Sequence, residues 1–189
     1  GTLTLLDLPE NSIAVAYSKP KAPSAANAVL AELFEPVSVI KIITLLAHLR
    51  HDDGGFFPLV CRGSSTLGGK VFYDSMKHGT LRDFSQALAL SCSTSFIRMG
   101  LEVGHASLAD LLQRFAFNSP AFNDWFLEFP TGTFNSKPGS ASQLASLALG
   151  QGEIRVTTLH AAVLAAIFSQ NGQLFPPYLI DDAKNILGL

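Results

Sequence analysis

The sequence predicts an α+β fold that is mostly helical and begins with a β-hairpin. Two apolar, β-prone runs, at residues 2–7 and 13–17, flank a short segment with Pro and Asn, which is typical of a turn. In the second half of the chain, apolar residues recur mainly at helical spacing. We therefore expect a hairpin in residues 1–18 and a helical region in residues 35–180, within one domain over residues 1–189.

Between the hairpin and the later helices, residues 56–73 contain short apolar pieces interrupted by glycines, which predict small strands or irregular loops. Helices are predicted where apolar residues recur with a period near 3.6. The longest of them is followed by Asn-Gly and then Pro-Pro, which are typical stop signals. These predicted helices cover residues 81–90, 94–103, 107–115, 142–149 and 157–169.

The composition argues against several classes of protein. A formal net charge of −2, with 15% charged residues, offers no basic surface for nucleic acid. The longest apolar run, residues 161–168, is too short to cross a bilayer. The first residues lack the basic and apolar regions of a secretory signal. We expect neither nucleic-acid binding nor a membrane span in this sequence.

Cysteines and histidines are too few and too scattered along the chain to predict a metal site. The two cysteines, Cys61 and Cys92, exclude a disulfide-rich scaffold and lack the spacing of zinc ligands, and one bridge between them is left open. We expect the histidines to be structural or surface residues: His48, His51, His78, His105 and His160. Neither a metal ion nor a cofactor is predicted.

A serine and a lysine three residues apart are the first candidates for chemistry. Residues 35–46 predict a helix in which Ser38 and Lys41 share one face, with Pro36 near the first helical position, where its missing N–H is not needed. The helix N-terminus favours developing negative charge near Ser38. Because the lysine leads into an apolar run, its pKa is expected to be lowered. A neutral amine beside a hydroxyl can activate a nucleophile.

The Ser-x-x-Lys string alone is weak, because it occurs twice in this chain. In the other copy, Ser18 and Lys21 lie in a Pro-rich stretch that predicts a loop with no shared helical face. Without its context, Ser38 would be read as a helix-start serine and Lys41 as an exposed lysine.

A second group of hydroxyl side chains follows the predicted helix at residues 81–90. The sequence Ser91-Cys92-Ser93-Thr94 comes directly after an Ala- and Leu-rich segment. On its own it could be an ordinary polar helix junction with a buried thiol. The Ser-x-Asn string that begins at Ser169 stands before a glycine and predicts a helix cap and turn.

In this order, these segments resemble the penicillin-binding protein transpeptidase family, whose signature includes Ser-x-x-Lys. Residues 35–50 are similar to its nucleophile helix, and Ser91 and Ser93 match the two polar positions of its Ser-x-Asn motif. Further likenesses follow in the order of the family, from Leu3 to about Ile180. They are Cys61-Arg62-Gly63, Lys77-His78-Gly79, residues 148–159 and residues 171–178.

The resemblance implies a partial transpeptidase-like domain, the helical part of a β-lactamase/transpeptidase-like fold with its amino-terminal hairpin. It implies that Ser38 attacks a peptidoglycan D-Ala-D-Ala peptide or a β-lactam and forms an acyl-serine intermediate. Lys41 would be the general base, Ser91 would pass the proton to the leaving amine, and Ser93 would hold Lys41 or the substrate. No cofactor is implied. The location would be the bacterial cell envelope, on its periplasmic or extracytoplasmic side.

Three features depart from the family pattern. Ser93 replaces an asparagine whose amide both donates and accepts hydrogen bonds, and Val37 replaces the usual glycine before the nucleophile. No Lys-Thr-Gly or Lys-Ser-Gly string occurs. In the family that motif lies on a strand that supplies an oxyanion-hole donor, and losing one such donor slows reactions by about 10²–10³-fold. Two alternatives therefore stay open: a non-catalytic relative that binds wall peptide or a partner protein, and one fragment of an active enzyme.

The hairpin predicts a contact with another chain. A lone two-stranded hairpin is marginal in water, and in the family it pairs with the later strands that carry the third motif. An unpaired apolar edge is a template for another strand. We expect a partner at this edge, most simply a second copy of the chain that forms a homodimer.

Overall fold

The computed structural model describes residues 2–10, 12–18, 30–51, 54–120, 129–137 and 139–177. The chain divides into two compact units, each built from segments far apart in the sequence. The first comprises Gly1–Phe34, Phe115–Thr133 and Arg155–Leu189, and the second comprises Glu35–Arg114 and Phe134–Ile154. The fold class is α+β, as predicted, and the single domain over residues 1–189 stays a prediction.

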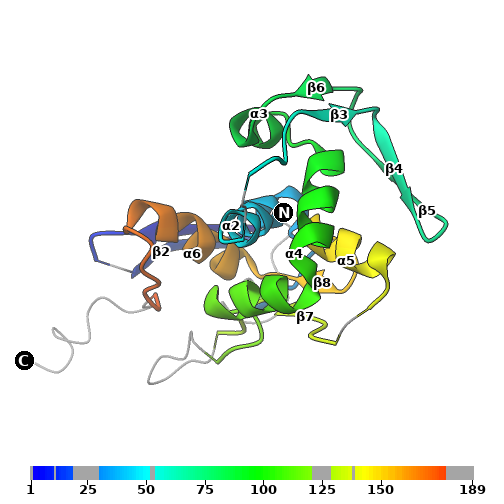
Figure 1. Ribbon diagram of the computed structural model, residues 1–189. Helices are drawn as coiled ribbons and strands as arrows, with labels where there is room; N and C mark the ends of the chain where they lie inside the picture. The colour runs from blue at the N-terminus through cyan, green and yellow to red at the C-terminus, as the bar shows by residue number, and fades with distance from the viewer. Residues whose placement is uncertain are drawn as a thin grey trace, which may run out of the picture. The chain divides into compact units, whose positions relative to one another are not determined.

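In the first unit, an antiparallel hairpin packs against one helix (Figure 1). Strand β1 (Thr2–Asp7) pairs with β2 (Ser12–Ser18), with a register shift between Leu5 and Leu6, so the predicted hairpin is confirmed. Helix α6 (Thr158–Ser169) lies against β1, and Thr4 Oγ1 donates to Thr158 Oγ1 at 2.9 Å. The buried core of this unit is formed by Ile13, Leu30, Ala116, Phe129, Leu159 and Val163.

The second unit is built on three packed helices, α2 (Lys41–Leu49), α4 (Ser93–Arg114) and α5 (Ala141–Ala148). Figure 1 shows α2 and α5 on either side of α4. Gly100 allows the close approach of α4 and α5, because a Cβ there would lie 2.4 Å from the Cβ of Ala148. Thr44 Oγ1 donates to the Ala148 carbonyl at 2.8 Å, which ties α2 to α5. This packing holds the start of α2 beside the start of α4.

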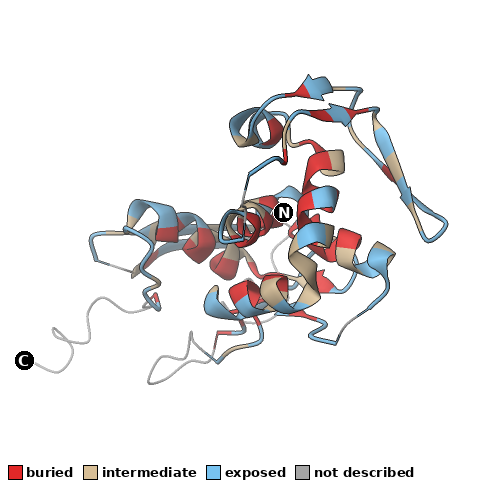
Figure 2. Cartoon of the chain, viewed as in Figure 1, coloured by how far each residue is buried: buried red, intermediate tan, exposed pale blue. Residues whose placement is uncertain are grey.

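Short strands complete the second unit. Strand β3 (Leu59–Cys61) pairs with β6 (Gly79–Leu81), and β4 (Ser64–Leu67) pairs with β5 (Lys70–Tyr73), all antiparallel. Figure 2 shows β4 and β5 as mainly exposed, with Phe72 buried at 4% exposure. The remaining elements are the 3₁₀ helix η1 (Val37–Ile40), α3 (Phe84–Ala89) and the two-residue strands β7 (Thr133–Phe134) and β8 (Ile154–Arg155).

Three of the predicted helices differ from the structure in their bounds or their continuity. The helix expected at residues 81–90 begins only at Phe84, because Asp83 is its N-cap and accepts from the Gln86 N–H at 2.7 Å. Leu81 instead belongs to β6, where it pairs with Leu59. The helices expected at 94–103 and 107–115 are one element, α4, which is kinked at Gly104 (φ 78°).

The end of α6 agrees with the sequence. The helix stops at Ser169, and Asn171 and Gly172 follow with φ of 55° and 79°. The Ser-x-Asn string there is a helix end, as predicted. Among the described residues, no helix has both the length and the apolar character needed to cross a bilayer.

Candidate active site

Ser38 lies on a short 3₁₀ helix immediately before α2. The prediction of one continuous α-helix over residues 35–46 is wrong in this detail, because η1 occupies Val37–Ile40 and α2 begins at Lys41. Pro36, with φ −71°, is the N-cap of η1, so the segment does begin at the proline. Ser38 is exposed, whereas Lys41 is buried at 4% exposure.

The backbone before Ser38 has an unusual conformation. Val37 has φ 42°, a region that β-branched residues rarely adopt. Its N–H donates to the Gly150 carbonyl at 2.9 Å. Gly150 itself has φ 71°, and a Cβ on it would lie 2.1 Å from the Val37 carbonyl oxygen. The turn after α5 therefore fixes the backbone that presents Ser38.

The Lys41 amine reaches the segment between α3 and α4. Its Nζ lies 2.6 Å from the Ser91 carbonyl oxygen, 3.0 Å from Ser91 Oγ and 3.3 Å from Ser93 Oγ. Ser91 Oγ donates to Ser38 Oγ at 3.2 Å. Ser91 therefore lies within hydrogen-bond reach of both Ser38 and Lys41, and Ser93 also contacts Lys41.

The order of these contacts matters for proton transfer. Among the described residues, the hydrogen bond that reaches Ser38 Oγ comes from Ser91 and not from Lys41. Each hydroxyl can both donate and accept. The three side chains therefore form a path, Ser38–Ser91–Lys41, along which a proton can move.

Burial sets the electrostatics of the lysine. Desolvation lowers the pKa of Lys41 from its usual 10.5, and the negative charge of Asp74 and the Cys92 thiol offset this only in part. The Lys41 amine also lies 5.6 Å from the centre of the Phe96 ring. The amine is therefore neutral over a wider pH range than an exposed lysine, which suits a general base.

Asp74 is a site residue that the sequence did not indicate. It follows β5, and its carboxylate accepts from the Ser93 N–H, from the Thr94 N–H at 3.1 Å and from Thr94 Oγ1 at 2.7 Å. Although burial alone would raise the pKa of Asp74, these hydrogen bonds, those of Thr94 foremost, hold it below the usual value. Asp74 thus caps α4 and fixes the backbone of Ser93. No spacing rule links it to a serine 19 positions later, so only the fold shows this role.

The same carboxylate belongs to a group of side chains with metal-ligating atoms. Cys61, Asp74, His78 and Cys92 each offer one such atom, and these atoms lie within 4.8 Å of one another. Both cysteines are free and buried. The fold thus joins four segments that the linear spacing separates, and the sequence-based prediction that His78 is a structural or surface residue stays a prediction.

The sequence of the chain is similar to that of known proteins. The family model "Penicillin binding protein transpeptidase domain" matches residues 1–186. The chain belongs to this family. It is similar to the peptidoglycan D,D-transpeptidase PbpA of Mycobacterium tuberculosis, with 27% identity over 169 residues, and to PbpA of Mycolicibacterium smegmatis, with 26% identity over 180 residues. The matches cover 86% and 87% of the chain but 34% of each relative, so the chain spans about a third of their length.

Solved structures of this family share the fold. The ceftriaxone acyl-enzyme complex of penicillin-binding protein A from M. tuberculosis matches with a TM-score of 0.73 and 26% identity, over 85% of this chain and 37% of that one. The imipenem acyl-enzyme complex of the same protein matches with a TM-score of 0.81 and 22% identity, over 95% and 48% of the two chains. Penicillin-binding protein A of M. tuberculosis thus forms acyl-enzymes with these two β-lactams.

Proposed function

We propose that this chain supplies the nucleophile and the general base of a serine D,D-transpeptidase that acts on peptidoglycan D-Ala-D-Ala peptides. The observation that carries the proposal is the hydrogen-bonded path from Ser38 through Ser91 to the buried amine of Lys41. Membership of the transpeptidase family supports it. The proposal places the protein in the bacterial cell envelope, where that substrate is found, and needs no cofactor and no nucleic acid.

The geometry suits acyl transfer in two halves. Ser38 Oγ attacks the peptide carbonyl carbon, its proton passes to Ser91 Oγ, and the Ser91 proton passes to the neutral Lys41 amine. When the tetrahedral intermediate collapses, the C–N bond breaks, the leaving amine takes a proton from Ser91 Oγ, and Ser91 regains a proton from the Lys41 ammonium, which returns to its neutral form. The acyl group then remains on Ser38 until an acceptor amine attacks it and restores the free hydroxyl. A β-lactam would react through the first half alone.

Ser93 has a positioning part in this proposal. Its Oγ lies 3.3 Å from Lys41 Nζ, so it orients the amine where the family has an asparagine. A serine is shorter than asparagine and offers one hydroxyl instead of a separate donor and acceptor. We therefore expect Ser93 to hold Lys41 and not to reach the substrate at the same time.

A second candidate is a non-catalytic relative that binds wall peptide or a partner protein. Two observations favour it: Ser93 at the asparagine position, and Val37, at φ 42°, where the family has glycine. Both alter the immediate surroundings of Ser38 without removing the Ser38–Ser91–Lys41 path.

Labelling with a fluorescent penicillin separates these candidates. The transpeptidase proposal expects covalent labelling that disappears in Ser38→Ala and nearly disappears in Lys41→Ala. The matched control is Ser18→Ala, the serine of the other Ser-x-x-Lys string, which should label like the parent. We expect residues 1–189 on their own to label weakly, because they contain no Lys-Thr-Gly or Lys-Ser-Gly string and the loss of one oxyanion donor lowers rates by about 10²–10³-fold. Labelling that survives Ser38→Ala would contradict the assignment, and a folded chain without any labelling would favour the binding role.

A homodimer through the hairpin is also proposed. The side chains of Leu3, Leu5, Val15 and Tyr17 are exposed. They lie side by side as the cross-strand pairs Leu3–Tyr17 and Leu5–Val15. Within the described part of the chain, β1 and β2 form a sheet with no third strand, so each has an edge that could accept another strand. A second copy of the hairpin offers matching apolar surface and matching backbone groups.

A further inference from the structure

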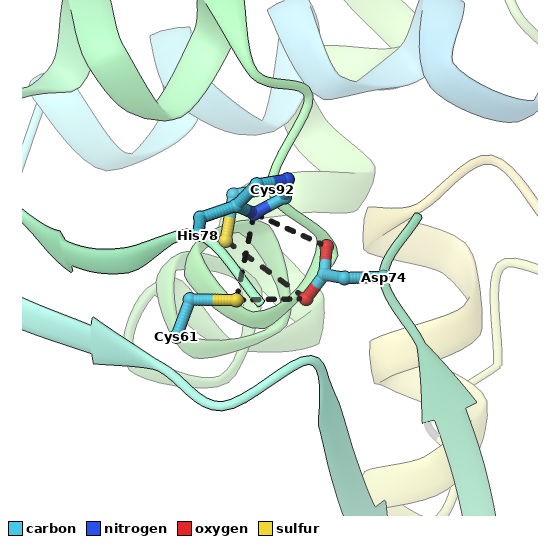
Figure 3. Close-up of side chains that lie close together, drawn as sticks. All are labelled: Cys61, Asp74, His78 and Cys92. Carbon is cyan, nitrogen blue, oxygen red and sulfur yellow. Dashed lines mark hydrogen bonds and ion pairs between the residues drawn. The ribbon is translucent and has the colours of Figure 1, made fainter. Parts of the chain in front are cut away.

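Four potential metal ligands, Cys61, Asp74, His78 and Cys92, lie close together in the second unit (Figure 3). Cys61 ends β3, Asp74 follows β5, His78 precedes β6 and Cys92 lies between α3 and α4. The pairing of Cys61 with Gly79 brings the first cysteine beside the histidine. The four side chains come from four segments of the chain, so no linear sequence motif indicates that they lie together.

Their separations fit the coordination sphere of one metal ion. Cys61 Sγ lies 3.3 Å from Asp74 Oδ2 and 3.5 Å from His78 Nδ1, Cys92 Sγ lies 3.9 Å from Asp74 Oδ2, and His78 Nδ1 lies 4.0 Å from Asp74 Oδ1. Bond lengths to zinc of about 2.3 Å for sulfur and 2.0–2.2 Å for nitrogen and oxygen place tetrahedral ligand atoms roughly 3.4–3.8 Å apart. The side chains would need only small movements to bring their ligand atoms to these distances around one ion.

The surroundings support the ligands in the way metal sites require. The side chains of His78 and Asp74 are 2% and 1% exposed, and Cys61 and Cys92 are 1% and 0% exposed. The Asp74 carboxylate is oriented by the hydrogen bonds from Ser93 and Thr94 already described, as ligating carboxylates usually are. A helix cap explains Asp74 alone. It gives no reason for two thiols and an imidazole to meet the same carboxylate.

We propose that Cys61, Asp74, His78 and Cys92 bind a single structural divalent ion of the zinc class. Two thiolates and an imidazole favour zinc over magnesium or calcium, and four protein ligands make a closed, non-catalytic site. Cys92 stands between Ser91 and Ser93, so the ion would anchor the loop that meets Lys41 and Ser38. The proposal concerns structure and metal content, and it stands whether or not Ser38 is acylated.

The test measures metal binding directly on the reduced, chelator-treated chain. We expect one equivalent of zinc in a competition titration with a chromophoric chelator. Cobalt should give the visible bands of a tetrahedral ion and a thiolate charge-transfer band in the near ultraviolet. His78→Ala and Cys61→Ser should lower zinc affinity by more than the roughly 10- to 100-fold that outer-shell changes cost. His51→Ala, an exposed histidine outside the cluster, is the matched control and should bind zinc like the parent.

Asp74→Asn separates a ligand from a helix cap, because the amide oxygen can still accept from the start of α4 but carries no charge. We expect it to keep the helical circular dichroism signal and to lose zinc affinity. A parent chain with both thiols free that binds neither zinc nor cobalt would overturn the proposal, whatever the variants do. A metal-free chain in which Cys61 and Cys92 form a disulfide would overturn it as well.

Discussion

The buried amine of Lys41 is the residue on which the proposed chemistry depends. It lies 3.0 Å from Ser91 Oγ, and desolvation lowers its pKa. An amine acts as a base only when it is neutral, so the low pKa extends its useful range toward neutral pH.

The rate of penicillin labelling should therefore rise with pH through the lowered pKa of Lys41 and level off below the usual lysine value of 10.5. Lys41→Arg should abolish labelling at every pH, since a guanidinium stays charged. Lys70→Arg, at an exposed position, is the control. A rate–pH profile unchanged by Lys41→Arg would show that another group is the base.

Val37 adopts a left-handed conformation that costs a β-branched residue about 1–2 kcal/mol. Val37→Gly should remove this strain, which stabilises the folded state, but glycine loses more backbone entropy on folding, which destabilises it. Because the two effects are of similar size, the free energy of unfolding should stay within about 1 kcal/mol of the parent. Val39→Gly, on the same 3₁₀ helix and equally exposed, has no such strain to relieve and should lose about 1 kcal/mol. Urea unfolding of both variants checks the difference. Equal losses would show that the Val37 backbone is not strained.

At the scale of elements, the turn after α5 positions η1. The carbonyl of Gly150 accepts from the Val37 N–H, and its Cα faces the Val37 carbonyl so closely that no side chain fits. The placement of Ser38 thus depends on a glycine more than 100 positions away in the sequence.

Gly150→Ala should destabilise the second unit by about 3 kcal/mol or more, because both the positive φ and the clash act against it. Gly152→Ala is the matched control: it also has positive φ, 80°, but its nearest side-chain neighbour would be 3.4 Å away. We expect it to lose about 1–2 kcal/mol. Thermal unfolding of the two variants measures the gap. Similar losses of stability in the two variants would mean that the backbone around Val37 can move to accommodate the added methyl group without a measurable cost.

Helix α6 is linked to its unit by a buried neutral histidine. His160 Nδ1 accepts from the Gly132 N–H at 2.6 Å, and its Nε2 donates to the Phe115 carbonyl at 2.7 Å. Burial lowers the pKa of His160 to about 4, and the bond to Phe115 offsets this only in part. Protonation would break the bond from Gly132, because Nδ1 would lose its lone pair.

The unfolded state therefore binds more protons than the folded state between pH 6.5 and about 4. Stability contributed by neutral His160 is complete above pH 6.5 and should fall, by up to about 3 kcal/mol, as pH drops toward 4. Melting temperatures measured across this range should fall more steeply for the parent than for His160→Gln. His105→Gln, at a partly buried surface position, should keep the slope of the parent. An unchanged slope in His160→Gln would rule out this linkage.

At the scale of the whole molecule, the exposed apolar face of the hairpin predicts self-association. Light scattering of the purified chain should give the mass of a dimer, and Leu5→Lys with Val15→Lys should give a monomer, because charges on paired apolar positions oppose strand addition. Tyr73→Lys, a more exposed apolar position on β5, should leave the dimer intact. A parent chain that stays monomeric at high concentration would disprove the dimer.

The sequence by itself determined the local elements and the family. Two apolar, β-prone runs around a Pro/Asn turn predicted the hairpin, and helical spacing predicted α5, α6 and, as two helices, the segment of α4. The ordered motifs identified Ser38, Lys41, Ser91 and Ser93 as the candidate site. These features depend on short-range periodicity and capping, which neighbouring residues dictate. The one local error at the site, an α-helix through Ser38, arose because the backbone there is bent by a hydrogen bond to Gly150.

Only the tertiary structure decided what distant segments do together. The path of Ser38 to Lys41 through Ser91, the capping of α4 by Asp74 and the meeting of Cys61, His78 and Cys92 all join parts of the chain 14 or more positions apart. Such contacts are set by how α2, α4 and the short strands pack, and packing responds to shape and volume across the whole unit. This packing cannot be inferred from the spacing of residues along the sequence. The sequence therefore identified which residues could react, and the fold determined which of them touch.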